Sequence, residues 1–96
     1  MVSGASGASL MNTAFLLMAK YNGTPIIPAQ QVCDDFFPHL TLVKFLRKIS
    51  DGQIPLPVVR IEDSQKSAKG VHLQDLADYL DARRSEAQRE FQQMYG

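Results

Sequence analysis

The fold of this chain is decided by residues 28–52, which read PAQQVCDDFFPHLTLVKFLRKISDG. Two apolar stripes with the i, i+3, i+4, i+7 spacing of an amphipathic helix follow each other here. The first helix is expected over Ala29 to Phe37, with Pro28 suited to its first turn, and Pro38 ends it. The two stripes are Ala29, Val32, Cys33 and Phe36, followed by Leu42, Phe45, Leu46 and Ile49. Two short helices joined by a tight turn predict a helix-turn-helix.

The second of these helices carries a cluster of cations. It is expected to begin after a Thr41 N-cap and to end before Gly52, and its basic residues occupy the face that the apolar stripe leaves free. In a helix-turn-helix, this face meets the base edges and phosphates of duplex DNA. We therefore assign to the DNA groove Thr41, Lys44, Arg47 and Lys48. Arg47 is predicted to contact a base edge, because a guanidinium donates two hydrogen bonds to guanine. A merely solvated helix face is the alternative reading of the same charges.

Residues 57–73 predict a β-hairpin. Two prolines exclude a helix before the β-branched run of residues 58–61, and residues 71–73 alternate as the return strand. The tip between the strands is polar and basic, which is typical of a wing that follows the flanking DNA backbone or minor groove. The hairpin residues assigned to DNA are Ser64, Gln65, Lys66, Ser67 and Lys69.

The N-terminal part of the chain contains an apolar run that predicts a helix. Asn12 or Thr13 can cap it, residues 14–21 are mostly good helix formers, and Asn22-Gly23 supplies a left-handed stop. A short buried strand is the alternative, since periodicity does not separate the two for so short a run. Residues 1–10, MVSGASGASL, resemble an expression tag or its scar and are expected to be disordered, which leaves residues 11–96 as one domain.

A long helix is predicted from Asp75 to Met94, because this stretch contains neither glycine nor proline. Its apolar residues form a narrow heptad seam. At about 1.5 Å of rise per residue, the last of them lie beyond the core of a small domain. This favours a homodimer, with a helix that only closes its own core as the alternative. The predicted dimer interface consists of Leu80, Arg84, Ala87, Phe91 and Met94.

The charge of the chain is concentrated in its middle third. The 96 residues carry ten lysines and arginines and ten acids, but residues 41–72 hold six of these cations against three acids. A concentrated basic patch matters more for phosphate binding than the total charge does. The composition, with 45% hydrophobic and 21% charged residues, is that of a single globular domain.

Several classes of function find no support in the sequence. Catalytic spacings, metal-ligand sets and glycine-rich phosphate loops are missing, so we expect neither an enzyme nor a cofactor. The single cysteine, Cys33, lies on an apolar stripe and is expected in the core, with a reducing, cytoplasmic location. His39 is expected to be a turn residue, and His72 to pack or cap. No apolar run is long enough for a membrane span, so no membrane contact is expected.

Several stretches together resemble the bacterial pyocin activator protein family. They are NTAFLLMA at 12–19, RKI at 47–49, IPLPVVRI at 54–61, SQKSAKGV at 64–71 and DLADYL at 75–80. The match covers essentially all of residues 11–96. The passage from Arg47 to Pro55, Arg-Lys-x-x-x-Gly-x-Ile-Pro, is also similar to phage excisionase and AlpA-type regulators. The predicted fold is therefore a small α+β winged helix-turn-helix, excisionase- or MerR-like, with an N-terminal helix and a long C-terminal helix.

The resemblance implies a sequence-specific DNA-binding transcriptional activator. Its targets would be repeated boxes upstream of phage-tail-like bacteriocin genes, and it would be produced when DNA damage lifts repression. The implied partners are double-stranded promoter DNA and a second copy of the chain, with RNA polymerase as a further candidate. It would be cytoplasmic, and on the nucleoid when bound. The alternative is an antirepressor or adaptor that binds another protein through its long helix and makes no DNA contact.

Overall fold

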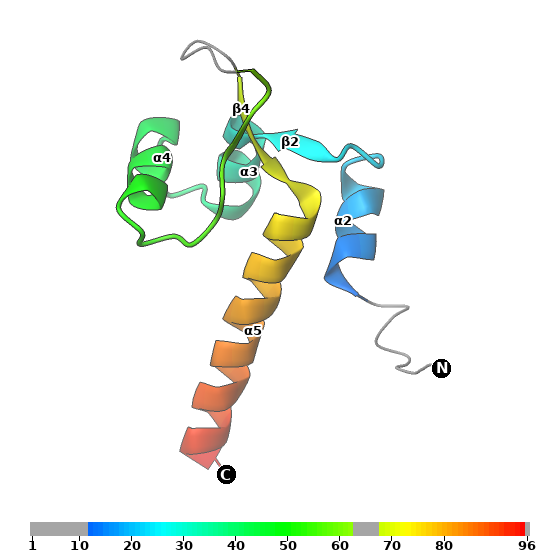
Figure 1. Ribbon diagram of the computed structural model, residues 1–96. Helices are drawn as coiled ribbons and strands as arrows, with labels where there is room; N and C mark the ends of the chain where they lie inside the picture. The colour runs from blue at the N-terminus through cyan, green and yellow to red at the C-terminus, as the bar shows by residue number, and fades with distance from the viewer. Residues whose placement is uncertain (1–11, 63–67, 96) are drawn as a thin grey trace.

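The computed structural model describes residues 12–62 and 68–95, which form a small α+β fold. This part contains four helices and one three-stranded antiparallel sheet (Figure 1). The predicted tag and the predicted DNA contacts Ser64, Gln65, Lys66 and Ser67 lie outside the described residues. The elements in chain order are α2 (Thr13–Lys20), β2 (Ile26–Pro28), α3 (Ala29–Phe36), α4 (Leu42–Ser50), β3 (Val59–Arg60), β4 (Lys69–His72) and α5 (Leu73–Tyr95).

The N-terminal apolar run is a helix, α2, and not a strand. The side-chain oxygen of Asn12 accepts a hydrogen bond of 2.7 Å from the backbone N–H of Phe15, which caps the first turn. Asn22 and Gly23 have φ angles of 56° and 74°, so the chain leaves the helix through the left-handed conformation that was expected. Local capping signals at both ends therefore decide this element.

Helices α3 and α4 lie close to their predicted positions. The first ends at Phe36, one residue before the expected end, and a turn closed by the Leu40 N–H on the carbonyl of Phe37 leads to the second. The hydroxyl of Thr41 caps α4, and Gly52 follows it with a φ of 78°. The rings of Phe37 and Phe45 pack with centroids 4.8 Å apart, which joins the turn to α4. Both helices are therefore confirmed.

The sheet contains a strand that the sequence analysis missed. Its order is β2-β4-β3, and β2 pairs with β4 so that Ile27 lies opposite Val71. The prolines at 25 and 28 indicated only a break in the chain. They are compatible with a strand here because β2 is at the edge of the sheet, where a missing N–H is tolerated.

The predicted hairpin exists, but its outgoing strand is shorter than predicted and its return strand is longer and begins earlier. The outgoing strand is Val59–Arg60 instead of residues 57–61, and the return strand is Lys69–His72 instead of residues 71–73. The shift arises at the end of the return strand, where Nδ1 of His72 accepts a hydrogen bond of 3.0 Å from the backbone N–H of Gln74. This contact confirms His72 as a capping residue. Helix α5 consequently begins at Leu73, two residues before its predicted start.

The core lies where α3, α4, the sheet and the start of α5 meet. Its largest fully buried side chains are those of Phe45, Ile27, Leu76, Val32, Val71 and Cys33. The Cys33 thiol donates to the carbonyl of Leu40 at 3.3 Å, and burial raises the pKa of this thiol, which confirms its core role. Gly70 belongs to the strand facing this core. A Cβ at Gly70 would lie 2.5 Å from Cγ2 of Ile26, so the Ile26 side chain can lie against β4 here only because residue 70 is glycine.

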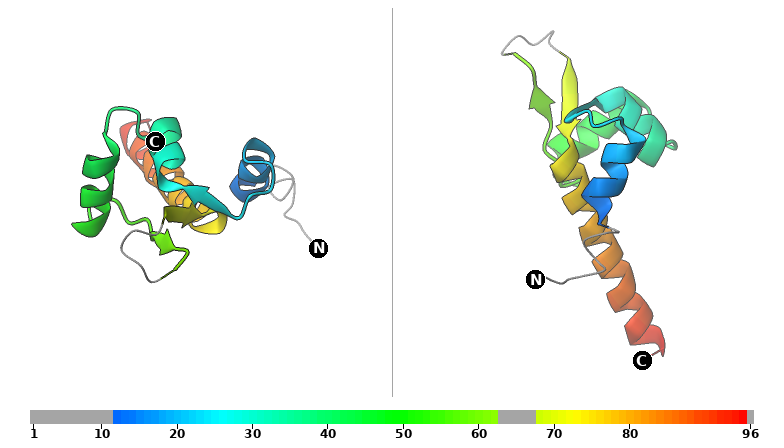
Figure 2. Two further views of the ribbon diagram at one scale, coloured as in Figure 1. Left: turned by 90° about the horizontal axis from the view of Figure 1, so that it is seen from above. Right: turned by 90° about the vertical axis from the view of Figure 1, so that its right-hand side faces the viewer.

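Helix α5 begins in the core and then leaves it. Leu73, Leu76 and Ala77 are buried, whereas every residue from 81 to 95 is exposed. Helix α2 lies beside the first half of α5, where the Thr13 hydroxyl donates to the carboxylate of Asp81. The second half projects away from the rest of the molecule (Figures 1 and 2). None of the described helices combines the length and the apolarity needed to cross a membrane.

Candidate nucleic-acid interface

The exposed side of α4 carries two cations that no other described group neutralises. Lys44 and Arg47 are three residues apart, so they lie on the same side of the helix, and both are exposed. Within residues 12–62 and 68–95, neither side chain forms an ion pair or a hydrogen bond. Thr41, which starts the helix, is also exposed, and its hydroxyl accepts from the Lys44 N–H at 3.2 Å. The first two turns of α4 thus present positive charge to solvent.

Lys48, the third cation predicted on this helix, is held differently. Its side-chain amine donates to Oε1 of Gln53 at 3.2 Å, and the residue is half-buried. The contact ties Lys48 to the turn that follows α4. The free charge of this helix is therefore concentrated on Lys44 and Arg47.

A small hollow connects α4 to the β3–β4 ribbon. Its volume is about 150 Å³, and it is lined by Leu46, Ile49, Ser50, Val58, Arg60 and Lys69. Ser50 lies one helical turn after Arg47, so the side of α4 that bears Arg47 adjoins the side that faces the ribbon. Cations on α4 and on the ribbon therefore belong to neighbouring parts of one surface.

Two of the ribbon's cations lie directly opposite each other. Arg60 of β3 pairs with Lys69 of β4 in the antiparallel register. Like charges at directly opposed positions destabilise a sheet unless another group neutralises them. In the part of the chain that the structure describes, no acid pairs with either side chain. An anion placed between Arg60 and Lys69 would remove this repulsion.

From the sequence, Lys69 was predicted to contact DNA, whereas Arg60 was not. Arg60 was counted among the cations of the middle third and lies within the predicted outgoing strand. Its pairing with Lys69 could not be predicted, because the long tip of the hairpin leaves the register of the two strands undetermined. We refer to Lys44, Arg47, Arg60 and Lys69 together as the cationic surface.

An exposed apolar side chain adjoins this surface. Val43 on α4 is 66% exposed, and it lies four residues before Arg47, on the same side of the helix. Apolar side chains at such positions contact the methyl group of thymine in the major groove. Val43 was not among the predicted site residues, although its position outside the apolar stripe of Leu42, Phe45 and Ile49 indicates that it is exposed.

The other described residues that could bind a metal ion or take part in a reaction do not form a second site. His39 lies exposed in the turn after α3, with its ring centroid 6.4 Å from that of Phe37. No group of three or more histidines, cysteines or acids that could hold a metal ion occurs among residues 12–62 and 68–95. The chemistry available to the described surface is therefore the binding of anions and apolar groups.

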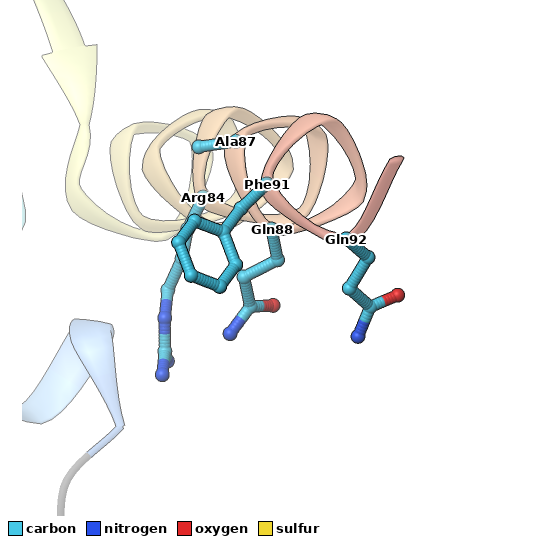
Figure 3. Close-up of a pocket in the computed structure, with 5 residues that line it drawn as sticks. All are labelled: Arg84, Ala87, Gln88, Phe91 and Gln92. Atoms are coloured by element: carbon cyan, nitrogen blue, oxygen red, sulfur yellow. The ribbon is translucent and has the colours of Figure 1, made fainter. Parts of the chain in front are cut away.

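The predicted dimer residues lie on the projecting half of α5, with one exception. Leu80 packs partly against the core of its own chain. Arg84, Ala87 and Phe91 line an open hollow of about 430 Å³ together with Gln88 and Gln92 (Figure 3), and Met94 is 74% exposed. Arg84, Ala87, Phe91 and Met94 are all exposed in the described structure, so a partner could reach them.

Comparison with known proteins identifies one family. The family model described as "Pyocin activator protein PrtN" matches residues 13–87, which include every described helix and strand up to the middle of α5. No curated protein and no solved structure matches the chain significantly.

Proposed function

Since the chain belongs to the pyocin activator family, we propose that it binds duplex DNA sequence-specifically and activates the transcription of pyocin genes. The family is one of regulatory activator proteins and not of enzymes. In the proposal, α4 enters the major groove and the β3–β4 ribbon follows the flanking backbone. The antirepressor or adaptor remains the competing function, and the experiment below separates the two.

The observation that carries the proposal is the unneutralised charge of the cationic surface. Lys44 and Arg47 are exposed without an acidic partner among the described residues, and Arg60 and Lys69 face each other across the ribbon. A protein gains nothing for its own stability by opposing two cations on a short ribbon. Phosphate groups of a nucleic acid would neutralise all four charges, and that gain would appear as binding free energy.

The order of the elements supports the same function. Helices α3 and α4 are joined by a tight turn, and the two-strand ribbon follows, which is the order of a winged helix-turn-helix. In that arrangement the second helix of the pair is the one inserted into the major groove. Thr41, Val43 and Lys44 lie at the beginning of α4, where a recognition helix meets the bases, and Arg47 follows one helical turn after Lys44.

Three further parts of the proposal have the family as their only support. They are production in response to DNA damage, contact with RNA polymerase at the promoter and a cytoplasmic location on the nucleoid. We assign no residue of the described surface to a contact with RNA polymerase. Gene expression measured before and after DNA damage tests the first of these parts.

The proposal is tested by selecting bound fragments from random-sequence DNA and measuring affinities for them. The double variant Lys44→Ala, Arg47→Ala should lose at least tenfold in affinity, since two exposed groups that contact DNA are removed. The matched control is Lys20→Ala, Arg89→Ala, which removes the same net charge from α2 and from the far side of α5. Equal losses of DNA affinity in the two variants would mean that binding depends only on the total charge of the protein. Full activation by the Lys44, Arg47 and Lys48 triple alanine variant would establish the adaptor instead.

The salt dependence of binding measures how many phosphates the surface neutralises. With about three to five phosphates per protomer, the logarithm of the binding constant should fall with the logarithm of the salt concentration at a slope of roughly −3 to −5. A flat dependence would contradict the role assigned to the cationic surface.

A further inference from the structure

The second half of α5 has a face that no other part of the described structure covers. Residues 81–95 form about four helical turns, and every one of them is exposed. A helical segment of this length is marginally stable in water unless an apolar face is packed against something. Phe91 and Tyr95 are 62% and 72% exposed, and their rings lie 4.8 Å apart. This half of the helix therefore has the features of an interaction surface.

The uncovered face continues the face of α5 on which α2 packs. Helix α2 contacts the first half of α5, where the Thr13 hydroxyl donates to Asp81. Residues spaced alternately by four and three positions lie on one side of a helix. We call such a row, which passes through Asp81, the α2-facing row. It consists of Ala77, Asp81, Arg84, Gln88, Phe91 and Tyr95. In Figure 3, Arg84 and Gln88 project to the side of α5 on which the pale blue α2 is seen. The row is thus covered by α2 in its first half and bare in its second.

Helix α2 also has an apolar face without a cover in the described structure. Leu17 is buried in the core. At roughly 3.6 residues per turn, Phe15 lies nearly opposite Leu17, with Leu16 and Met18 on its flanks. These three side chains are 58%, 50% and 50% exposed. Since a helix that is apolar on all sides is typical of a buried position, the outer face of α2 needs a partner as well.

We propose that two copies of this chain pair reciprocally, with the outer face of α2 in each copy packed on the bare half of the α2-facing row in the other. Each α2 then lies between two α5 helices, with Leu17 towards its own and Phe15 towards that of the second copy. A second copy is the occupant because α2 already packs on the first half of this row, and a second copy supplies another α2 for the second half. Two-fold symmetry forms the contact twice and covers both exposed faces of each chain.

The directions and spacings of the helices fit this arrangement. Helix α2 begins beside Asp81, and the chain after it returns to the start of α5, where the Leu73 N–H donates to the carbonyl of Pro25. Helix α2 is therefore antiparallel to its own α5. If the two α5 helices of the dimer are antiparallel, each α2 runs parallel to the α5 of the second copy.

In this parallel packing, large side chains meet at matching levels. Phe15 and Met18 are about one helical turn apart on α2, as Phe91 and Tyr95 are on α5. The hollow of about 430 Å³ beside Phe91 lies on this row and can receive one of the large side chains of α2 from the second copy. The two faces are therefore complementary in spacing and in shape.

The contact uses no α5 side chain that is already packed in the core. Ala77 and Leu80 remain in contact with their own chain. Arg84, at the start of the bare half, lies one turn after Asp81, where α2 begins. It therefore lies between the two α2 helices of the dimer, where its stem can pack while its guanidinium stays in water.

The pairing leaves the cationic surface free. That surface belongs to α4 and the β3–β4 ribbon, whereas the pairing uses α2 and the second half of α5. Helices α2 and α4 lie on opposite sides of α5, both in Figure 1 and in the view from above in Figure 2. The inference therefore goes beyond DNA binding and does not depend on it.

Introducing opposite charges into α2 and α5 tests the pairing in the full chain without DNA. Sedimentation equilibrium should show a dimer for the unchanged chain. Phe15→Lys and Phe91→Glu, taken singly, should each raise the dimer dissociation constant about 100-fold or more, because each buries two unpaired charges. In a heterodimer of the two variants, one contact keeps both phenylalanines and the other places the introduced lysine beside the introduced glutamate. An equimolar mixture should therefore dimerise within about tenfold of the unchanged chain.

The control is Gln93→Glu, which adds a negative charge on the side of α5 opposite the row and should leave the dissociation constant unchanged. Phe15 and Phe91 lie outside the core, so each single variant should still unfold cooperatively in urea. The proposal would be overturned by a monomeric unchanged chain, by single variants that dimerise as well as the unchanged chain, or by a mixture that dimerises no better than its components. Because no DNA is present, none of these outcomes bears on the proposed function.

Discussion

Helices α3 and α4 have the same apolar spacing but use their polar faces differently. The acids of α3 are engaged within the chain. Asp35 accepts a hydrogen bond of 2.6 Å from the Tyr21 hydroxyl and lies 3.8 Å from the Lys20 amine, and Asp34 accepts from Gln30. In contrast, Lys44 and Arg47 of α4 have exposed side chains with no partner among the described residues.

The comparison shows that the apolar stripe and the polar face of a short helix determine different properties. Burial of the stripe decides where the helix packs. The polar face decides whether the helix only supports the fold, as α3 does, or carries binding free energy, as we propose for α4. Changes on the two sides of α4 should therefore affect different measurements.

The largest effect is expected from the buried side of α4. Phe45 is fully buried and packs against Phe37, so Phe45→Ala should lower the free energy of unfolding by about 3–5 kcal/mol. Urea unfolding followed by circular dichroism measures this loss. Val43→Ala, on the exposed side, should stay within about 0.5 kcal/mol. Similar losses for the two variants would mean that α4 has no distinct buried and free sides.

The next effect concerns DNA binding and sharpens the contrast between the helices. Arg47→Ala should reduce affinity for the preferred site by about 1–3 kcal/mol and relax base preference, whereas Lys69→Ala should weaken all sequences alike, as Lys66→Ala should too. Titrations on matched and scrambled DNA separate the two behaviours. Asp34→Asn, on α3, should leave base preference unchanged. Equal losses for Arg47→Ala and Lys69→Ala on both DNAs would contradict the division between base and phosphate contacts.

A smaller effect is expected at the start of α4. Its first turn depends on the Thr41 hydroxyl, whereas α3 follows Pro28 at the end of β2 without a side-chain cap. Thr41→Ala should therefore cost about 0.5–2 kcal/mol of stability in thermal or urea unfolding. Thr41→Ser keeps the hydroxyl and should retain most of it. If the alanine variant were as stable as the serine variant, the Thr41 hydroxyl would not stabilise α4.

The smallest effect tests the contacts that the acids of α3 make within the chain. Tyr21→Phe removes the hydrogen bond to Asp35 and should cost about 0.5–1.5 kcal/mol at neutral pH. Burial, reinforced by this hydrogen bond and by the charge of Asp35, raises the pKa of Tyr21.

The raised pKa of Tyr21 also predicts a pH dependence. An unfolded tyrosine titrates near pH 10, so the folded chain retains this proton to higher pH. The stability that Tyr21 contributes is therefore complete below about pH 10 and is lost as the pH rises above it. The difference in unfolding free energy between the unchanged chain and Tyr21→Phe should shrink at alkaline pH. A difference that does not change with pH would contradict the raised pKa.

Much of the helical structure was predictable, and for local reasons. The Asn12 and Thr41 caps, the left-handed stops at Gly23 and Gly52 and the burial of Cys33 follow from spacing and from capping chemistry within a few residues. The same local signals did not predict the sheet correctly. Strand β2 has only three residues, with a proline just before it and another at its end, and nothing near it in the chain indicates that it pairs with residues 70–72.

The candidate site divides in the same way. Lys44, Arg47 and Lys48 were predictable from the periodicity of one helix, but the engagement of Lys48 by Gln53 was not. Arg60 was missed because its importance depends on Lys69, which is opposite it in the sheet and nine residues away in the chain.

Helix periodicity, caps and stops act between residues at most four or five positions apart, so the amino-acid order alone specifies where the helices of this protein lie and which of their faces are apolar or charged. The edge strand β2, the opposition of Arg60 and Lys69, their approach to α4 and the point at which α5 leaves the core all depend on contacts between distant parts of the chain. Those contacts form only when the whole core packs, because the free energy that holds each of them comes from burial shared among several elements.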